Sequence, residues 1–125
     1  MARILIAEDE QALRAQCARA LADDGHEVAT ACDGSEALDQ LAREGGRFDL
    51  LLADIRMPIM DGIALALAAA RDYPELTVLL MTGYADQRER AHGLDAIIHD
   101  VIAKPLSPAT LRAGVNEALA VKRRN

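Results

Sequence analysis

The sequence is poor in aromatic residues and contains no long apolar run. Only Phe48, Tyr73 and Tyr84 are aromatic, although 51% of the residues are hydrophobic. The core must therefore be built from aliphatic side chains. No stretch approaches the roughly 18 consecutive apolar residues of a membrane span. The first residues turn acidic at Glu8 and lack the pattern of a cleavable signal peptide, so we expect a cytoplasmic protein.

Basic residues are in the minority. The chain has 14 Lys and Arg against 20 Asp and Glu, and its formal net charge is −6. A nucleic-acid-binding domain would need a basic face, and an anionic membrane surface attracts basic segments. We therefore expect neither nucleic acid nor a membrane as a partner.

Cysteine is also scarce. Cys17 and Cys32 do not have the spacing of a metal or redox motif. Cys17 lies four residues from both Leu13 and Leu21, which places it on the apolar face of a helix. We expect both thiols to fill space in the core.

The sequence does contain an alternation of short apolar runs and helical patterns. Strands are predicted at residues 4–7, 27–31, 48–53, 76–81 and 101–103, and helices over about residues 10–24, 34–44, 62–72, 85–96 and 108–121. Ser107 and Pro108 are the expected N-cap and first residue of the last helix. Apolar strands that alternate with helices predict an α/β fold, with a doubly wound, five-stranded parallel sheet covered on both faces. The length suits one domain, residues 1–125, with no output domain.

Polar side chains follow the predicted strands where the strands end. Asp54 ends a buried apolar run, Glu8 and Asp9 follow the first strand, Thr82 ends the fourth and Lys104 follows the fifth. Because the carboxyl ends of parallel strands meet at one edge of the sheet, these side chains are expected to converge there.

Such a group of side chains suits phosphoryl transfer. Carboxylates within about 4–6 Å repel one another, and a hard cation with oxygen ligands, such as Mg²⁺, relieves the repulsion. Lys104 and Thr82 can bind an anion, and a metal with a lysine facing a carboxylate neutralises a transferring phosphoryl group. Asp54 can be the nucleophile, because carboxylates form aspartyl phosphates.

Four segments resemble the receiver domain of bacterial two-component response regulators. They are the pair Glu8-Asp9, DIRMPIMDG from Asp54, MTGYA from Met81 and AKP from Ala103. Each segment lies at a predicted strand end, and the resemblance extends along essentially the full length of the chain. The resemblance implies the CheY-like, flavodoxin-like arrangement with strand order 2-1-3-4-5.

The resemblance also implies a role for each residue that would handle the phosphoryl group. Asp54 is the expected phosphoryl acceptor. Thr82 would bond the phosphoryl group, and Lys104 would hold one of its oxygens. Pro105 is expected to follow a cis peptide bond.

The same resemblance implies a Mg²⁺ site. Asp9 and Asp54 would be ligands, together with Glu8 acting through water and the backbone carbonyl of Arg56. Many members of the family have two aspartates where this chain has Glu8-Asp9. The longer Glu8 side chain should still serve.

One departure from the family concerns the residue that changes conformation when the domain is phosphorylated. Many receivers carry Tyr or Phe three residues before the lysine, where this chain has Val101. The usual coupling between Thr82 and an aromatic ring is therefore in doubt. Tyr84, two residues past Thr82, is a candidate gate over the site, and an exposed loop tyrosine is the alternative.

The segments MARILIAEDE, MPIMDGIALALAAA and MTGYADQRERAHGLDAIIHD are similar to CpdR-like single-domain receivers of alphaproteobacteria. The predicted function is a stand-alone switch, not an enzyme, phosphorylated by a sensor histidine kinase or a histidine phosphotransfer protein. Its downstream protein target would bind the face formed by strand 4, helix 4, strand 5 and helix 5. The CpdR-like resemblance implies control of regulated proteolysis or of the cell cycle.

Three other functions are weighed against this one. A haloacid-dehalogenase-type phosphatase would need a DxD motif after the first strand, and Glu8-Asp9-Glu10 lacks that spacing. A scaffold that never takes phosphate should have lost Asp54, Lys104 or an acidic ligand. A dinucleotide-binding domain would carry GxGxxG after the first strand, and this chain does not.

Overall fold

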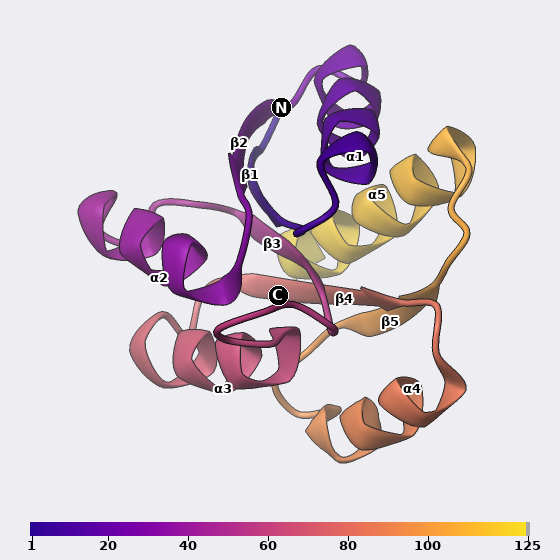
Figure 1. Cartoon of the computed structure of the whole chain (residues 1–125). Coiled ribbons are helices and arrows are strands. Elements are labelled where there is room, and N and C mark those ends of the chain that lie inside the picture. The colour runs from indigo at the N-terminus through magenta and orange to yellow at the C-terminus, as the bar shows by residue number, and fades with distance from the viewer. Residues whose placement is uncertain (125) are drawn as a thin grey trace.

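The computed structural model is a five-stranded parallel sheet with helices on both faces (Figure 1). It describes residues 1–124, without the side chains of residues 85–87, 92 and 122–124. The strands are β1 (Arg3–Ala7), β2 (Glu27–Ala31), β3 (Leu50–Asp54), β4 (Thr77–Thr82) and β5 (Asp100–Ala103). The helices are α1 (Gln11–Asp23), α2 (Gly34–Arg43), α3 (Gly62–Asp72), α4 (Ala85–Ala91), the short 3-10 helix η1 (His92–Leu94) and α5 (Pro108–Arg124). The sheet order β2-β1-β3-β4-β5 confirms the fold that the resemblance implied.

Each face of the sheet has its own aliphatic core. Along β1, Leu5 and Ala7 pack into the core on the side of α2, α3 and α4, whereas Ile4 and Ile6 pack into the core on the side of α1 and α5. Figure 1 shows α1 and α5 above the sheet and α2, α3 and α4 below it. Because successive strand residues point to opposite faces and both faces are covered, the central strands are apolar except at their ends.

The helix predicted over residues 85–96 is wrong in its length. α4 ends at Ala91, and the chain continues through η1 before β5 begins at Asp100. Gly93 falls within this stretch, and glycine weakens a helix because it loses more backbone entropy than other residues.

The last helix begins as predicted. Ser107 Oγ accepts a 3.0 Å hydrogen bond from the backbone N–H of Thr110, as an N-cap does. α5 then runs to Arg124, three residues beyond its predicted end. Neither α5 nor any other helix in residues 1–124 combines the length and the apolar character needed to cross a membrane.

The two cysteines differ. Cys17 lies on the inner face of α1 and is 2% exposed, as predicted. The prediction for Cys32 is wrong, because this thiol is exposed. Cys32 comes one residue after the end of β2, in the turn that leads to α2, so its side chain no longer follows the alternation of the strand.

Candidate functional site

Lys104 connects the ends of β1, β3 and β5. Its Nζ donates one hydrogen bond of 2.9 Å to Glu8 Oε1 and another of 2.9 Å to Asp54 Oδ2. The side chains of Glu8, Asp54 and Lys104 are only 1%, 8% and 19% exposed. The expected convergence is therefore observed for these three residues, which are far apart in the sequence.

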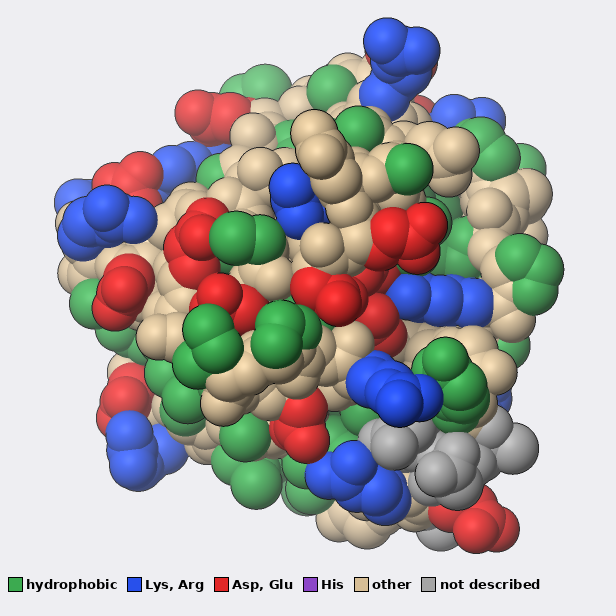
Figure 2. Space-filling view, in the orientation of Figure 1, with side chains coloured by type: hydrophobic (Ala, Val, Ile, Leu, Met, Phe, Trp, Pro, Cys, Tyr) green, Lys and Arg blue, Asp and Glu red, His purple; other side chains and the backbone are tan. Residues whose placement is uncertain are grey.

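Asp9 completes a cluster of carboxylates beside Lys104. One carboxylate oxygen from each of Glu8, Asp9 and Asp54, hereafter the buried cluster, lies within 4.8 Å of the others. Glu8 and Asp54 are buried and Asp9 is exposed, so the cluster opens to solvent on one side. In Figure 2, red acidic side chains gather near the centre of the face, with blue basic side chains beside them.

The buried cluster carries more negative charge than Lys104 can balance. Burial, opposed by hydrogen bonds from the Glu10 N–H and Lys104, raises the pKa of Glu8 from 4.5 to about 7. Burial alone would lower the pKa of Lys104, but its hydrogen bonds to Glu8 and Asp54 outweigh that effect and raise the pKa. An all-oxygen donor set with a deficit of positive charge fits Mg²⁺.

The turn after β1 holds Glu8 and Asp9 in place. The Glu8 N–H donates a 3.0 Å bond to the carbonyl of Ala31 in β2. Arg14, in the first turns of α1, donates from Nη1 to the carbonyl oxygens of Glu8 at 2.8 Å and Asp9 at 3.5 Å. No sequence pattern points to Arg14, because its role depends on where the turn brings the backbone carbonyls of Glu8 and Asp9.

The loop between β3 and α3 holds Asp54. The backbone N–H of Arg56 donates to Asp54 Oδ1 at 3.4 Å, and the Gly62 N–H donates to the carbonyl of Ile55 at 2.8 Å. A Cβ atom on residue 62 would collide with the carbonyl oxygen of Asp54, so only glycine fits there. Asp61 caps α3, since its Oδ1 accepts from the Ala64 N–H at 2.8 Å.

Thr82 lies at the same edge and is 3% exposed. Its carbonyl accepts the Lys104 N–H at 2.9 Å, which ties the ends of β4 and β5 together. Its Oγ1 accepts a 3.1 Å bond from the Tyr84 N–H. A hydroxyl that accepts a bond keeps its own proton available for donation.

Three further predictions concern the neighbours of these residues. The Lys104–Pro105 bond is cis, as the resemblance implied. Val101 packs into the core on the α4 side, and this aliphatic side chain cannot make the inward movement of an aromatic ring. Tyr84 is 51% exposed, and the Arg56 guanidinium carbon lies 4.8 Å from the centre of its ring.

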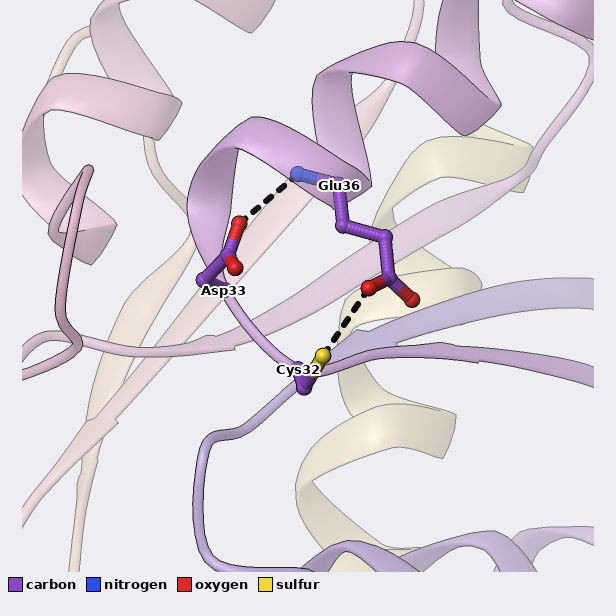
Figure 3. Close-up of side chains that lie close together, drawn as sticks. All are labelled: Cys32, Asp33 and Glu36. Carbon is purple, nitrogen blue, oxygen red and sulfur yellow. Dashed lines mark hydrogen bonds between the residues drawn. The ribbon is translucent and has the colours of Figure 1, made fainter.

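A second cluster lies after β2, at the same edge of the sheet. One possible ligand atom from each of Cys32, Asp33 and Glu36, hereafter the exposed cluster, lies within 4.8 Å of the others. Figure 3 shows that they bond to one another: Asp33 Oδ1 accepts the Glu36 N–H at 2.8 Å, and Cys32 Sγ donates to Glu36 Oε2 at 2.9 Å. The bond to Asp33 caps α2. The spacing of the two cysteines could not have revealed the grouping.

Comparison with known proteins agrees with this geometry. A family model described as the response regulator receiver domain matches residues 4–116. The response regulator MprA of Mycobacterium avium (strain 104) is 35% identical over 117 residues, which are 94% of this chain and 50% of that protein. The chain thus spans about half the length of the curated relatives it matches.

Solved structures show the same fold. A CheY-like receiver domain protein from Methanospirillum hungatei JF-1 superposes with a TM-score of 0.89 at 31% identity, covering 99% of this chain and 98% of that one. The response regulator TrrA from Thermotoga maritima, solved in complex with Mg²⁺-BeF, gives a TM-score of 0.82 at 27% identity, covering 94% and 99%. The chain therefore belongs to the response regulator receiver domain family.

Proposed function

We propose that this receiver is a phosphorylation switch in which Asp54 accepts the phosphoryl group. Receiver domains are signalling switches of two-component systems and interact with histidine kinases and downstream effectors. The observation that carries the proposal is the bond from Lys104 to Asp54 within a group of three carboxylates. The donor would be a sensor histidine kinase or a histidine phosphotransfer protein, which places the reaction in the cytoplasm.

The two oxygens of Asp54 are not equivalent, which indicates how transfer would proceed. Oδ2 accepts the short bond from Lys104, whereas Oδ1 receives only a 3.4 Å contact from the Arg56 N–H. Oδ1 is therefore the freer nucleophile. It would attack the phosphorus of a phosphohistidine, the P–N bond would break, and the histidine would keep the electron pair and take up a proton.

The other residues would bind the product of that transfer. Lys104 would hold a phosphoryl oxygen, and Thr82 would donate its hydroxyl proton to another. Mg²⁺, which receiver domains typically bind at this acidic pocket, would be held by Glu8, Asp9, Asp54 and the carbonyl of Arg56. When bound, it would neutralise charge on the phosphoryl oxygens. The donor set of the buried cluster supports this assignment.

Phosphorylation would act by changing the charge at one edge of the sheet. The phosphoryl group adds roughly −1.5 to −2 charges and three acceptor oxygens. Thr82 would leave the Tyr84 N–H to bond it, which would alter the loop before α4. A coupling of about 1–3 kcal/mol would change the affinity for a protein partner about 5- to 150-fold. The face formed by β4, α4, β5 and α5 is the proposed partner surface.

Two finer parts of the proposal rest on the resemblance alone. They are that residues 1–125 act as a stand-alone regulator without an output domain, and that the output is CpdR-like control of proteolysis or the cell cycle. The switch would modify only itself and turn over no external substrate, in the manner of a regulator rather than an enzyme.

Intact-mass spectrometry with acetyl phosphate tests the acceptor. The wild type should gain one phosphoryl group in the presence of Mg²⁺ and none in its absence. Asp54→Asn should gain none, because an amide cannot form the acyl phosphate. Asp33→Asn, which removes a carboxylate from the exposed cluster, is the matched control and should gain the group normally. No gain by folded wild-type protein would favour the scaffold that never takes phosphate.

A further inference from the structure

Arg56 and Tyr84 form a contact between the two loops that flank Asp54. The Arg56 guanidinium lies over the Tyr84 ring at 4.8 Å, and both side chains are exposed. The backbone N–H of Arg56 donates to Asp54, and the N–H of Tyr84 donates to Thr82. The two stacked residues are thus the ones whose main chains bond the proposed acceptor and the proposed phosphoryl-binding hydroxyl.

We propose that the Arg56 side chain is a further phosphoryl ligand, held on the Tyr84 ring until Asp54 is phosphorylated. The inference rests on the proposed function of Asp54 and adds to it. It assigns to the Arg56 side chain a role separate from that of its backbone carbonyl.

Reach and charge support the transfer of Arg56 from ring to phosphoryl group. Its backbone nitrogen lies 3.4 Å from Asp54 Oδ1, so its long side chain begins beside the atom that would carry the phosphoryl group. Guanidinium groups bind phosphoryl oxygens through charge-assisted, often bidentate hydrogen bonds. A cation–π contact at an exposed site is weaker than such bonds, so the guanidinium should bind the phosphoryl group in preference to the Tyr84 ring.

The stack is therefore a competitor of the phosphorylated state. In the unmodified protein, Tyr84 holds Arg56 in place, and the strength of an exposed cation–π contact limits its effect to about two- to fivefold. After phosphorylation, the Arg56 guanidinium would leave the Tyr84 ring, and that face of the ring would become exposed. Tyr84 acts in this scheme as a positioning residue, because it does not itself touch the phosphoryl group.

The two side chains should have opposite effects on the phosphorylated state. Arg56→Gln removes the ligand and should weaken binding of a phosphoryl mimic about fivefold or more. Tyr84→Leu removes the competitor and should strengthen binding about two- to fivefold. The double variant should behave like Arg56→Gln alone, because Tyr84 acts only through Arg56.

Isothermal titration calorimetry of beryllofluoride at a fixed Mg²⁺ concentration measures these affinities. Arg71→Gln is the matched control, since Arg71 is an exposed arginine that pairs only with its neighbour Asp72 among the contacts described, and it should leave the affinity unchanged. Nuclear magnetic resonance gives a second readout: the Arg56 side-chain protons should show a ring-current shift that Tyr84→Leu abolishes and that beryllofluoride removes in the wild type.

The outcomes separate this inference from the proposal on which it rests. If wild-type protein neither binds beryllofluoride nor takes a phosphoryl group, the function proposed for Asp54 fails and the role of Arg56 fails with it. If the wild type binds but both single variants are unchanged, or shift in the same direction, only the role of Arg56 is overturned. Opposite shifts with a silent control establish it.

Discussion

The buried cluster and the exposed cluster have similar distances between their possible ligand atoms but differ in burial and in hydrogen bonding. Each brings three possible ligand atoms within 4.8 Å of one another at the carboxyl edge of the sheet. In the exposed cluster, the polar atoms bond to one another and cap a helix. In the buried cluster, two carboxylates lie out of water and share one ammonium group.

The difference shows that short distances between possible ligand atoms do not identify a functional site. Buried negative charge that its neighbours do not fully neutralise does. In the exposed cluster Cys32 is exposed and the two carboxylates, Asp33 and Glu36, are partly exposed, so water solvates them and they have no need of a cation. A buried carboxylate must be neutralised by a proton, an ammonium group or a metal ion. The bond between Lys104 and Asp54 supplies part of this neutralisation, and the raised pKa of Glu8 shows that the rest is missing. Variants of residues in the two clusters should therefore differ in their effects.

The largest effect on stability is expected from Lys104→Met. Removing the ammonium group leaves the carboxylates of Glu8 and Asp54 buried without the cation that they share, which should lower the free energy of unfolding in Mg²⁺-free buffer by roughly 3 kcal/mol. Mg²⁺ at about 100 times its dissociation constant should restore up to about 2.7 kcal/mol. Urea unfolding with and without Mg²⁺ measures both quantities.

The control for that experiment is Arg71→Met, which breaks an exposed ion pair with Asp72. Pairs of this kind are well solvated, so the free energy of unfolding should stay nearly unchanged. An equal loss in the two variants would show that burial of the Lys104 bonds contributes nothing special.

A smaller effect is expected from pH. The pKa of Glu8 in the folded protein is about 7, above its ordinary value of 4.5, because burial disfavours the ionised form. In Mg²⁺-free buffer, the contribution of Glu8 to stability should therefore be complete below about pH 4.5 and be lost as the pH rises through about 7. A shift of this size corresponds to about 3 kcal/mol, and because the cluster is open to solvent on one side we expect a loss of roughly 2 kcal/mol. The loss should be absent from Glu8→Gln.

Chemical unfolding between pH 4 and pH 8 compares Glu8→Gln with the wild type. Glu36→Gln, from the exposed cluster, controls for the loss of a carboxylate at the same edge of the sheet. If the free energies of unfolding of the wild type and Glu8→Gln differ by a constant amount over this range, burial does not raise the pKa of Glu8. Saturating Mg²⁺ should weaken the slope, because the ion needs the carboxylate form.

The smallest effect is expected at the two thiols. In native protein, iodoacetamide should modify Cys32 and spare Cys17, because burial raises the pKa of Cys17 to about 11. The hydrogen bond to Glu36 raises the pKa of Cys32, so Glu36→Gln should make Cys32 react faster. Mass spectrometry of the alkylated protein follows both sites. Rapid modification of Cys17 in folded protein would contradict the structure.

Much of the site could be predicted because it depends on the sheet. Apolar runs fix the strands, parallel strands end at one edge, and the residue after each end is therefore delivered to that edge. This is why Lys104 could be expected beside Asp54 and Glu8, which lie 50 and 96 positions away from it in the sequence. The two aliphatic cores follow from the same pattern.

The errors and omissions depend instead on loops. The exposure of Cys32 and the bonds from Arg14 are set by turn geometry, which leaves only a weak trace in the sequence. The collision that reserves residue 62 for glycine involves the carbonyl of Asp54, and no spacing rule describes it. The stack of Arg56 on Tyr84 needs two loops to be placed at once.

The central claim is that Asp54, and no other carboxylate, takes the phosphoryl group. Borohydride reduction converts an aspartyl phosphate to homoserine, which peptide mass spectrometry can locate. After treatment with acetyl phosphate and Mg²⁺, the account predicts homoserine at residue 54 alone, and none when Mg²⁺ is left out. Homoserine at residue 9 or 33, or equal labelling at residue 54 without Mg²⁺, would contradict it.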